Sequence, residues 1–452
     1  MIKRLIFTFL AVAAIATDMC ASPKYIFFFI GDGMGMGHIM ATENYRRTVL
    51  GEKTPMLMLT FPTVGVASTY SASSRVTDSA AAGTALACGR KTSNRMIGVT
   101  PDGVDTESMA ALLHRKGYGV GLVTTVAPDD ATPAAFYAHV KDRSQFDKIA
   151  DDAMESDYEF IAGANLRGSQ ENYDRFRKKG VSVVRGVDEC RRADTRRILL
   201  LNTDKAMPND VGYAIDSIAG VLNLPDMTRL CIDHLMKYTP DNFFMMVEGG
   251  SIDHAAHSND GAAVMKEVIN FNQALAYAYD FYVGHPDETV IIVTADHDTG
   301  GMATVSNGGE LSMADVQRIS KDRFNDRCKS IVAGKDGITW DEMYRMLTAD
   351  FGLGSRLKLS ADEEGALKKS FDRSFTAGAA SSHVTTYASY SEFVDTLYDI
   401  INSRMSICWI TNEHTANPVG VFAIGNGTEC LGRFIDNTDI YDFVTQGILD
   451  VD

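Results

Sequence analysis

Five stretches of the chain are apolar at nearly every position, without the alternation of hydrophobic and polar residues that a half-exposed strand shows. They are residues 25–30, 119–126, 243–247, 289–294 and 419–424. Such runs are typical of strands that are buried on both faces of a parallel sheet. Shorter apolar runs alternate with polar stretches over residues 151–230 and indicate further βα units. We therefore predict an α/β fold, a three-layer α/β/α sandwich around a large, mostly parallel central sheet, with 419–424 as its last strand.

The pattern changes between residues 308 and 405, where polar, helix-rich sequence replaces the apolar strands. Three capping boxes, in which Ser or Thr precedes Glu by three positions, begin at Thr339, Ser360 and Ser389. One apolar helical face is formed by Phe393, Leu397, Ile400 and Ile401. We predict a helical insertion at 308–405, within a core of residues 22–307 and 406–452. We expect it to lie beside the mouth of a site or at a subunit contact, and to supply no ligand.

Residues 1–21 have the pattern of an export signal. Lys3 and Arg4 precede an apolar run at 5–15 that is too short to span a membrane. We expect an exported protein, periplasmic or extracellular, that is anchored to a membrane only if Cys20 is lipidated. The residues before Cys20 match the usual context of a lipidated cysteine poorly, and no other stretch is long enough to be a transmembrane segment.

Composition and charge narrow the function. The 452 residues could form one large α/β domain or two to three smaller ones. The net charge of −16 argues against a nucleic-acid partner, which requires a basic surface. It does not exclude a phosphate substrate, because bound divalent cations would reverse the local field. The seven cysteines include no Cys-x-x-Cys pair, so a cysteine zinc site is not expected, although some cysteines of an exported protein could form disulfides.

Metal-binding residue types follow four of the apolar runs. In chain order they are Asp32, the loop of Asp130 and Thr132, Glu248, and the pair Asp296 and His297. Ligands of open parallel sheets bind beyond the carboxyl ends of the strands, so these side chains are expected to converge in one crevice. Four strands that each end in metal-binding residue types, together with the Asp253 and His257 pair described next, are hard to explain by a purely structural role of these residues.

A second signal follows Glu248. Asp253 and His257 are four residues apart on a helix that is predicted to begin near Ser251, so they share one face. Alone, this spacing is more often a surface ion pair or a helix cap. Together with the strand ends and His414, it gives a set of nitrogen and oxygen donors that suits zinc, and purely oxygen donors that suit magnesium.

Two further residues have an ordinary and a functional interpretation. Ser79 begins an alanine-rich helix, where its hydroxyl is either a cap, which is far commoner, or a nucleophile. The free N–H groups of that helix terminus would favour an anion. Arg143 is either a surface arginine or a bidentate ligand of phosphate.

These residues lie in motifs that resemble those of the alkaline phosphatases. The motifs are Phe29-Ile30-Gly31-Asp32-Gly33-Met34-Gly35, Thr77-Asp78-Ser79-Ala80-Ala81, Asp130-Ala131-Thr132-Pro133, Val247-Glu248-Gly249-Gly250-Ser251-Ile252-Asp253-His254, Thr294-Ala295-Asp296-His297 and His414-Thr415. They occur in the family's order and cover residues 25–300 and 409–430. The insertion at 308–405 matches nothing that we can place.

The resemblance implies hydrolysis of small-molecule phosphate monoesters through a phosphoserine on Ser79, with Arg143 holding the phosphate. It implies two zinc ions, a magnesium ion and a homodimer. One zinc ion would be held by Asp253, His257 and His414, and the second by Asp32, Asp296 and His297. The magnesium ion would be held by Asp32, Thr132 and Glu248.

Three positions affect how far the family's site can be carried over to this sequence. Asp130 and His254 stand where members vary, and both influence the third metal site as outer contacts. Thr299 stands where many members have a second histidine, so one outer contact is expected to be missing. A phosphodiesterase or another phosphoryl or sulfuryl hydrolase of the same superfamily remains an alternative, although the sulfatase motif Cys/Ser-x-Pro-x-Arg is absent at Ser79. A non-catalytic metal- or phosphate-binding protein is a more distant alternative. Such a protein would be expected to lack the nucleophile or the phosphate-binding arginine, and both Ser79 and Arg143 are present.

Overall fold

The computed structural model describes residues 23–169, 171–203, 211–334, 337–375, 383–385 and 388–449. The predicted export signal and Cys20 lie outside these residues. The six cysteines in the described part are all free, so none of them forms the disulfide that an exported protein could have. None of the described helices is long and apolar enough to cross a membrane.

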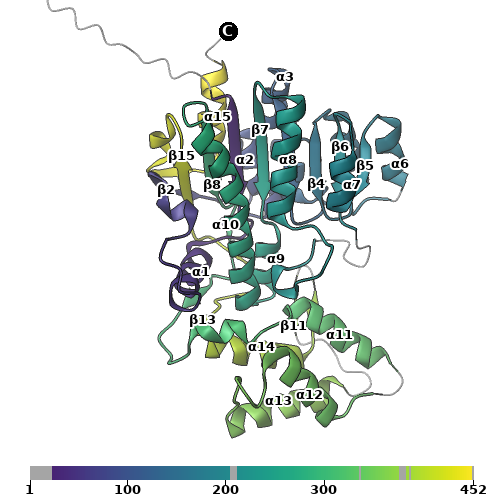
Figure 1. The fold of residues 1–452 in the computed structure, drawn as a ribbon, viewed down its shortest axis with the longest axis vertical. Coiled ribbons are helices and arrows are strands. Elements are labelled where there is room, and N and C mark those ends of the chain that lie inside the picture. Colours follow the sequence, from purple (N-terminus) through teal and green to yellow (C-terminus); the bar gives the residue numbers. More distant parts are fainter. Residues whose placement is uncertain are drawn as a thin grey trace, which may run out of the picture.

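Ten strands of the described chain form one central sheet (Figure 1). Their order across the sheet is β16 (Phe434–Asp436), β2 (Thr63–Ser68), β15 (Val419–Ile424), β8 (Thr289–Thr294), β1 (Tyr25–Ile30), β7 (Phe243–Glu248), β3 (Gly119–Thr124), β4 (Phe160–Gly163), β6 (Ile198–Leu201) and β5 (Ser182–Arg185). Only β15 runs against its neighbours, β2 and β8, and the other pairs are parallel. The prediction of a large, mostly parallel sheet is confirmed.

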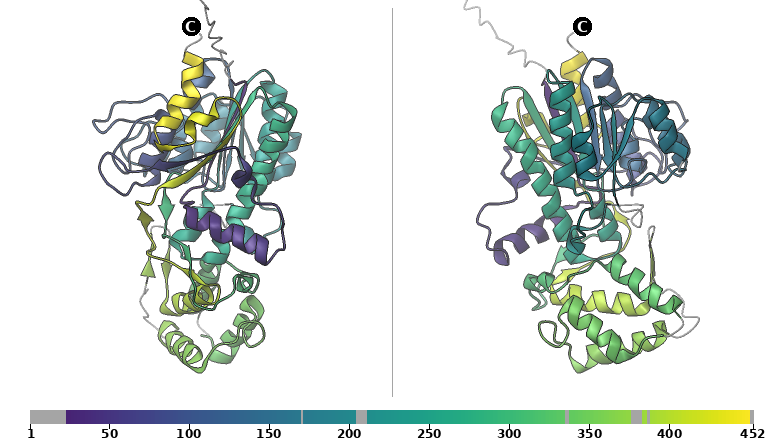
Figure 2. Two further views of the ribbon diagram at one scale, coloured as in Figure 1. Left: turned by 90° about the vertical axis from the view of Figure 1, so that its left-hand side faces the viewer. Right: turned by 45° about the vertical axis from the view of Figure 1, so that its right-hand side comes forward.

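Helices cover both faces of this sheet, which confirms the three-layer sandwich. In Figure 2 (left) the sheet lies between α10 on one side and α15 on the other. The helices of the core are α1 (Met36–Thr48), α2 (Ser79–Cys88), α3 (Met109–Arg115), α4 (Ala131–Ala134), α5 (Phe146–Glu155), α6 (Glu171–Lys178), α7 (Gly186–Arg192), α8 (Leu224–Tyr238), α9 (Ser251–His257), α10 (Gly261–Gly284) and α15 (Asp439–Leu449). His234 on α8 is structural, as its Nε2 atom lies 2.8 Å from the carbonyl oxygen of Arg196.

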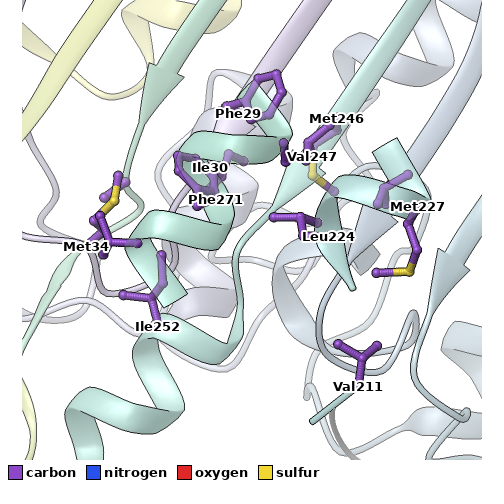
Figure 3. Packing of buried hydrophobic residues seen from close by; sticks show 14 of the residues in the cluster. Phe29, Ile30, Met34, Val211, Leu224, Met227, Met246, Val247, Ile252 and Phe271 are labelled. Carbon is purple, nitrogen blue, oxygen red and sulfur yellow. The ribbon is translucent and has the colours of Figure 1, made fainter. Parts of the chain in front are cut away.

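A cluster of buried apolar side chains packs around the ends of the central strands (Figure 3). Phe29 and Ile30 of β1, Val247 of β7, Ile252 of α9 and Phe271 of α10 are fully buried within it. The rings of Phe29 and Phe271 meet edge to face with centroids 5.6 Å apart. Because interiors of this kind are close-packed, the last residues of β1 and β7 and the start of α9 are held in a fixed relation.

Two strands of the central sheet, β2 and β16, were missed because they lie at one end of the sheet, where its faces are only partly covered. The residues of β2 alternate between buried and exposed positions, and Val64 is 55% exposed. The short strand β16 pairs only with β2, so 419–424 is not the last strand. Neither strand is covered on both faces, so neither has the continuous apolar run on which the prediction relied.

The predicted insertion is helical. It contains α11 (Lys321–Ala333), α12 (Trp340–Phe351), α13 (Ala361–Ser374) and α14 (Glu392–Arg404), with a short pairing of β11 (His383–Val384) and β12 (Ser389–Tyr390). Its two ends come together where β10 (Ala303–Thr304) pairs with β13 (Ile407–Cys408). In Figure 1 it lies beyond the carboxyl ends of the parallel strands, below α1 and α9.

Two of the three predicted capping boxes are present, at Thr339 and Ser360. The third is wrong, because Ser389 belongs to β12, where it pairs with Val384. The helix begins only after Ser391, whose side chain accepts a hydrogen bond from the backbone N–H of Val394.

Buried polar contacts tie the insertion to the core. At the start of α11, the backbone N–H of Lys321 donates to the Asp260 carboxylate at 2.7 Å, and its Nζ atom donates to the carbonyl oxygen of Ser258 at 3.0 Å. The hydroxyl of Ser258 donates to Asp322 Oδ1, also at 3.0 Å. Ser258 directly follows α9, so the insertion is bonded to the helix that carries Asp253 and His257.

Candidate functional site

The ends of four neighbouring strands lie at the same level. Ile30 of β1 is in register with Glu248 of β7 and Thr294 of β8, and Glu248 is in register with Thr124 of β3. Asp32, Glu248, Asp296 and His297, which end or follow these strands, are all buried. The structure thus brings together the polar residues that the sequence placed at the strand ends.

Three of these residues form a compact group around one imidazole. The Nε2 atom of His297 lies 3.4 Å from Asp32 Oδ1 and 3.2 Å from Asp296 Oδ2. Neither of these two buried carboxylate oxygens has a hydrogen-bond partner among the described residues. One nitrogen and two oxygen donors, all pointing at one another, make a group that could hold a metal ion.

Ser79 lies against this group. Its Oγ atom is 3.2 Å from His297 Nε2, and the side chain is buried. The cap of α2 is Asp78, whose Oδ1 atom accepts the backbone N–H of Ala81 at 3.0 Å. Ser79 is therefore the first residue inside the helix and its hydroxyl has no capping role, which removes the ordinary interpretation left open above.

A second group contains Asp253, His257 and His414. Nδ1 of His257 lies 2.6 Å from the carbonyl oxygen of Asn412, and Nδ1 of His414 lies 2.8 Å from that of Thr77. A carbonyl can only accept, so both Nδ1 atoms donate, and this orients both rings with Nε2 toward Asp253. These Nε2 atoms are 3.0 Å apart, and that of His257 is 3.4 Å from Asp253 Oδ2. Nitrogen and oxygen donors that face one another in this way suit a zinc ion.

His414 reaches the site through a small antiparallel pairing. Strand β14 (His414–Thr415) pairs with β9 (Asp298–Thr299), directly after His297. The pairing is reinforced by the hydroxyl of Thr415, which donates to Asp298 Oδ2 at 2.5 Å. His414, which follows the insertion in the chain, is thus placed beside candidate ligands that come before the insertion.

The third predicted group, Asp32, Thr132 and Glu248, is assembled more loosely. The hydroxyl of Thr132 is 3.5 Å from Asp32 Oδ2. Oε2 of Glu248 accepts a hydrogen bond from the hydroxyl of Thr124, and its buried Oε1 atom has no partner among the described residues. Thr124 was missed, although a hydroxyl at the end of a predicted strand could have indicated it.

The electrostatics of the three groups are those of crowded, buried carboxylates. Burial, followed by the neighbouring Asp296 and Asp253, raises the pKa of Asp32 well above its usual range. Burial also raises the pKa of Glu248 to about 8 and that of Asp296 to about 7. The pKa of Asp253 is lowered despite its burial, because His257 and His414 face it. Such a site is poor in positive charge, and divalent cations would supply it.

Arg143 lies between two carboxylates at the edge of the site. Its Nη2 atom donates to Asp130 Oδ1 at 2.9 Å, and its Nη1 atom is 3.6 Å from Asp78 Oδ2. The other oxygen of Asp130 binds Nη2 of Arg167 at 2.7 Å. Arg167 was missed because it lies in the loop after β4, whose end carries no metal-binding residue type. His254 is buried on α9. Despite burial, Arg167 and then Arg143 lower the pKa of Asp130 to about 2.

Thr299 replaces the expected second histidine with a different contact. Its hydroxyl donates to Asp253 Oδ1 at 2.5 Å and lies 3.2 Å from Nδ1 of His297. It therefore touches one member of each nitrogen-containing group, and it orients both.

Comparisons with known proteins agree with this arrangement. The family model for alkaline phosphatase matches residues 23–173 and 167–448. Alkaline phosphatase 3 of Bacillus subtilis (strain 168) is 32% identical over 443 residues, which span 92% of this chain and 87% of that protein. The repressible alkaline phosphatase of Saccharomyces cerevisiae (strain ATCC 204508 / S288c) is 26% identical, over 89% of this chain and 76% of that protein. The crystal structure of a cold-active alkaline phosphatase from the psychrophile Shewanella sp. matches with a TM-score of 0.79 and 26% identity, over 93% of this chain and 98% of that one.

Proposed function

The chain belongs to the alkaline phosphatase family and hydrolyses phosphate monoesters, and we propose that it does so through a covalent phosphoserine on Ser79. The observation that carries this proposal is the position of the Ser79 hydroxyl. It lies 3.2 Å from His297 Nε2, at the start of a helix whose cap is a different residue. The serine is therefore available for chemistry at the point where the candidate ligands meet.

Two displacements at phosphorus make up the reaction. In the first, a bond forms between Ser79 Oγ and phosphorus while the ester P–O bond breaks, and the alcohol leaves with a proton. In the second, water attacks the phosphoserine, releases inorganic phosphate and restores the hydroxyl. Through both, the N-terminal N–H groups of α2 and the Arg143 guanidinium face the negative charge on the other phosphate oxygens.

Three metal ions fit the donor sets. Asp253, His257 and His414 would hold one zinc ion, and Asp32, Asp296 and His297 a second, since both groups combine nitrogen with oxygen. Asp32, Thr132 and Glu248 offer only oxygen and would hold magnesium, with Asp130 and His254 beyond them. The unpartnered oxygens of Asp32, Asp296 and Glu248 support this assignment. When bound, such ions lower the pKa of a serine hydroxyl and stabilise the attacking and departing oxygens.

The proposal is tested by trapping the intermediate. The protein is mixed with a ³²P-labelled monoester, quenched in acid and digested, and the labelled peptide is identified by mass spectrometry. Label on the peptide that contains Ser79 is expected. Rates on matched monoester, diester and sulfate ester substrates, with metal analysis of the same preparation, would separate a phosphomonoesterase from its superfamily relatives.

Replacing Arg143 should weaken catalysis without emptying the metal sites. We expect Arg143→Ala to lower kcat/KM for an aryl phosphate by about tenfold to a few hundredfold, the worth of a charge-assisted hydrogen bond. Arg143→Lys should recover part of it, because an ammonium group cannot form the bidentate contact. Arg115→Ala, which removes an exposed ion pair with Glu107, is the matched control. Unchanged kinetics in Arg143→Ala would place the phosphate ligand elsewhere.

Metal removal should make the stability of the protein depend on pH. The folded-state pKa values of Asp296 and Glu248 are raised to about 7 and about 8, whereas unfolding returns them to their usual range. Groups shifted in this direction stabilise the fold at low pH and lose that contribution as pH rises through the folded pKa. Between pH 7 and 9 the melting temperature of chelated protein should fall by roughly 2 °C.

Histidine ordinarily changes its charge below pH 7. The buried His297 therefore does not oppose the fall in melting temperature between pH 7 and 9. Calorimetry of the chelated and the metal-loaded protein at both pH values provides the measurement. Equal melting temperatures of the chelated protein at pH 7 and 9 would show that these carboxylates are not crowded as described.

We propose the remaining features on the family resemblance and the sequence pattern. Residues 308–405 form an insertion beside the site, the protein is exported, and two copies form a homodimer. An intact N-terminus on the mature protein would contradict export. A monomeric mass by light scattering would contradict the homodimer.

A further inference from the structure

Arg143 and its neighbours form a row of alternating charges, Asp78, Arg143, Asp130 and Arg167. Asp130 stands between the two arginines and gives one oxygen to each, at 2.9 Å to Arg143 Nη2 and 2.7 Å to Arg167 Nη2. Both arginine side chains are largely buried, with 17% and 16% of their surface exposed, so solvent screens these contacts only weakly.

The loop that carries Arg167 is fixed to the same turn as Asp130. Both carboxylate oxygens of Asp129 accept the backbone N–H of Arg167 at 2.9 Å, and Oδ2 also accepts that of Gly168. Asp129 is fully buried. Two consecutive aspartates after β3 thus hold the backbone and the side chain of one residue in the loop after β4. Such a double attachment fixes the guanidinium more firmly than a surface ion pair would.

The charges of this row bear directly on phosphate binding. With all four residues ionised the row is neutral, because two carboxylates face two guanidinium groups. Without Arg167 it would carry one uncompensated negative charge, on the residue that Arg143 touches. A phosphate monoester carries nearly two negative charges at neutral and alkaline pH. An unbalanced Asp130 would both repel it and draw Arg143 away from it.

Arg167 acts on Asp130 at least as strongly as Arg143 does. The Arg167 contact, at 2.7 Å, is shorter than the Arg143 contact, at 2.9 Å, and the two guanidinium groups occupy different oxygens of Asp130. Each oxygen of the Asp130 carboxylate therefore has a cationic partner of its own.

We infer that Arg167 is a positioning residue for the phosphomonoesterase reaction, which balances the charge of Asp130 and so leaves Arg143 competent to bind phosphate. This inference rests on the proposed role of Arg143. Arg167 touches neither Ser79 nor any proposed metal ligand in the contacts given above, so it works through Asp130.

The test is a mutant cycle at Arg167 and Asp130 in the metal-loaded, full-length enzyme. Arg167→Ala should raise the inhibition constant of inorganic phosphate and lower kcat/KM for an aryl phosphate, each by about tenfold. Arg167→Lys, which keeps the charge, should recover most of the loss. Arg167→Gln keeps more of the packing than alanine and should resemble Arg167→Ala if both fold. Arg175→Ala, which removes an exposed arginine paired with Asp151, is the matched control.

The decisive variant is Arg167→Ala combined with Asp130→Asn. If Arg167 serves to balance Asp130, the second substitution removes the unbalanced charge, so the double variant should bind phosphate more tightly than Arg167→Ala alone. If the two losses multiply instead, Arg167 acts by another route and the inference is wrong. A wild-type enzyme that forms no phosphoserine would refute the proposed function itself. A wild type that forms it while Arg167→Ala stays unchanged would refute only this inference.

Discussion

Ser79→Ala is expected to abolish the phosphoenzyme and to lower kcat by at least about a thousandfold, because it removes the proposed nucleophile. The Oγ atom contacts His297, but the ligand groups themselves consist of other side chains. Zinc and magnesium contents should therefore remain near those of the wild type. The loss would then be one of chemistry and not of site assembly.

The measurement combines acid-quench labelling, steady-state kinetics and elemental analysis on the same protein. Ser330→Ala, on α11 in the insertion, is the matched control, since its hydroxyl only donates to the carbonyl of Asp326 within its own helix. It should keep wild-type labelling. Persistent ³²P label in Ser79→Ala would identify another residue as the nucleophile.

Asp253→Ala should remove about one zinc ion per chain, because a catalytic zinc site needs three protein ligands. Activity should fall together with the zinc content. The variant also removes the carboxylate that both His257 and His414 face. It further removes the acceptor of the Thr299 hydroxyl. The group of Asp32, Asp296 and His297 loses this outer contact, because Thr299 also lies against His297, and it should bind its ion less tightly.

Asp233→Ala provides the control for this experiment, as its carboxylate is 69% exposed and lies near only Arg229 on the same helix. Zinc content is measured after dialysis against buffer with limiting metal. A full complement of zinc in Asp253→Ala would exclude Asp253 from the ligands. Activity that returns at high zinc concentration would show weakened binding by the remaining ligands, and would agree with its role.

The central strands could be predicted because they are covered on both faces. The apolar runs that became β1, β7 and β8 are buried at every position. In β2 burial alternates, and β16 has only three residues, so neither carries this signal. The error at Ser389 had another cause. A capping box is a local pattern, and pairing with Val384 kept that residue in a strand.

The strand-end residues of the site could be predicted for a related reason. Parallel strands that begin in register also end together, so Asp32, Glu248 and Asp296 had to converge. Arg167 and the bridging role of Thr299 depend on contacts between loops, which no spacing along the chain encodes. His414 was a candidate donor from the sequence, but its assignment to the group of Asp253 and His257 came from the family resemblance, because its position depends on the pairing of β14 with β9.

The antiparallel strand β15 has a consequence for the order in which the chain can be completed on the ribosome. Strand β2 is made early, but its only neighbours in the sheet are β15 and β16, roughly 350 residues later. At about 5–20 residues per second, translation separates β2 from its first partner by roughly 20–70 s. His414 emerges just before β15 and is subject to the same delay. A nascent chain that stops short of residue 414 therefore lacks both a proposed metal ligand and β15, the strand that joins β2 to β8, and we expect it to be inactive.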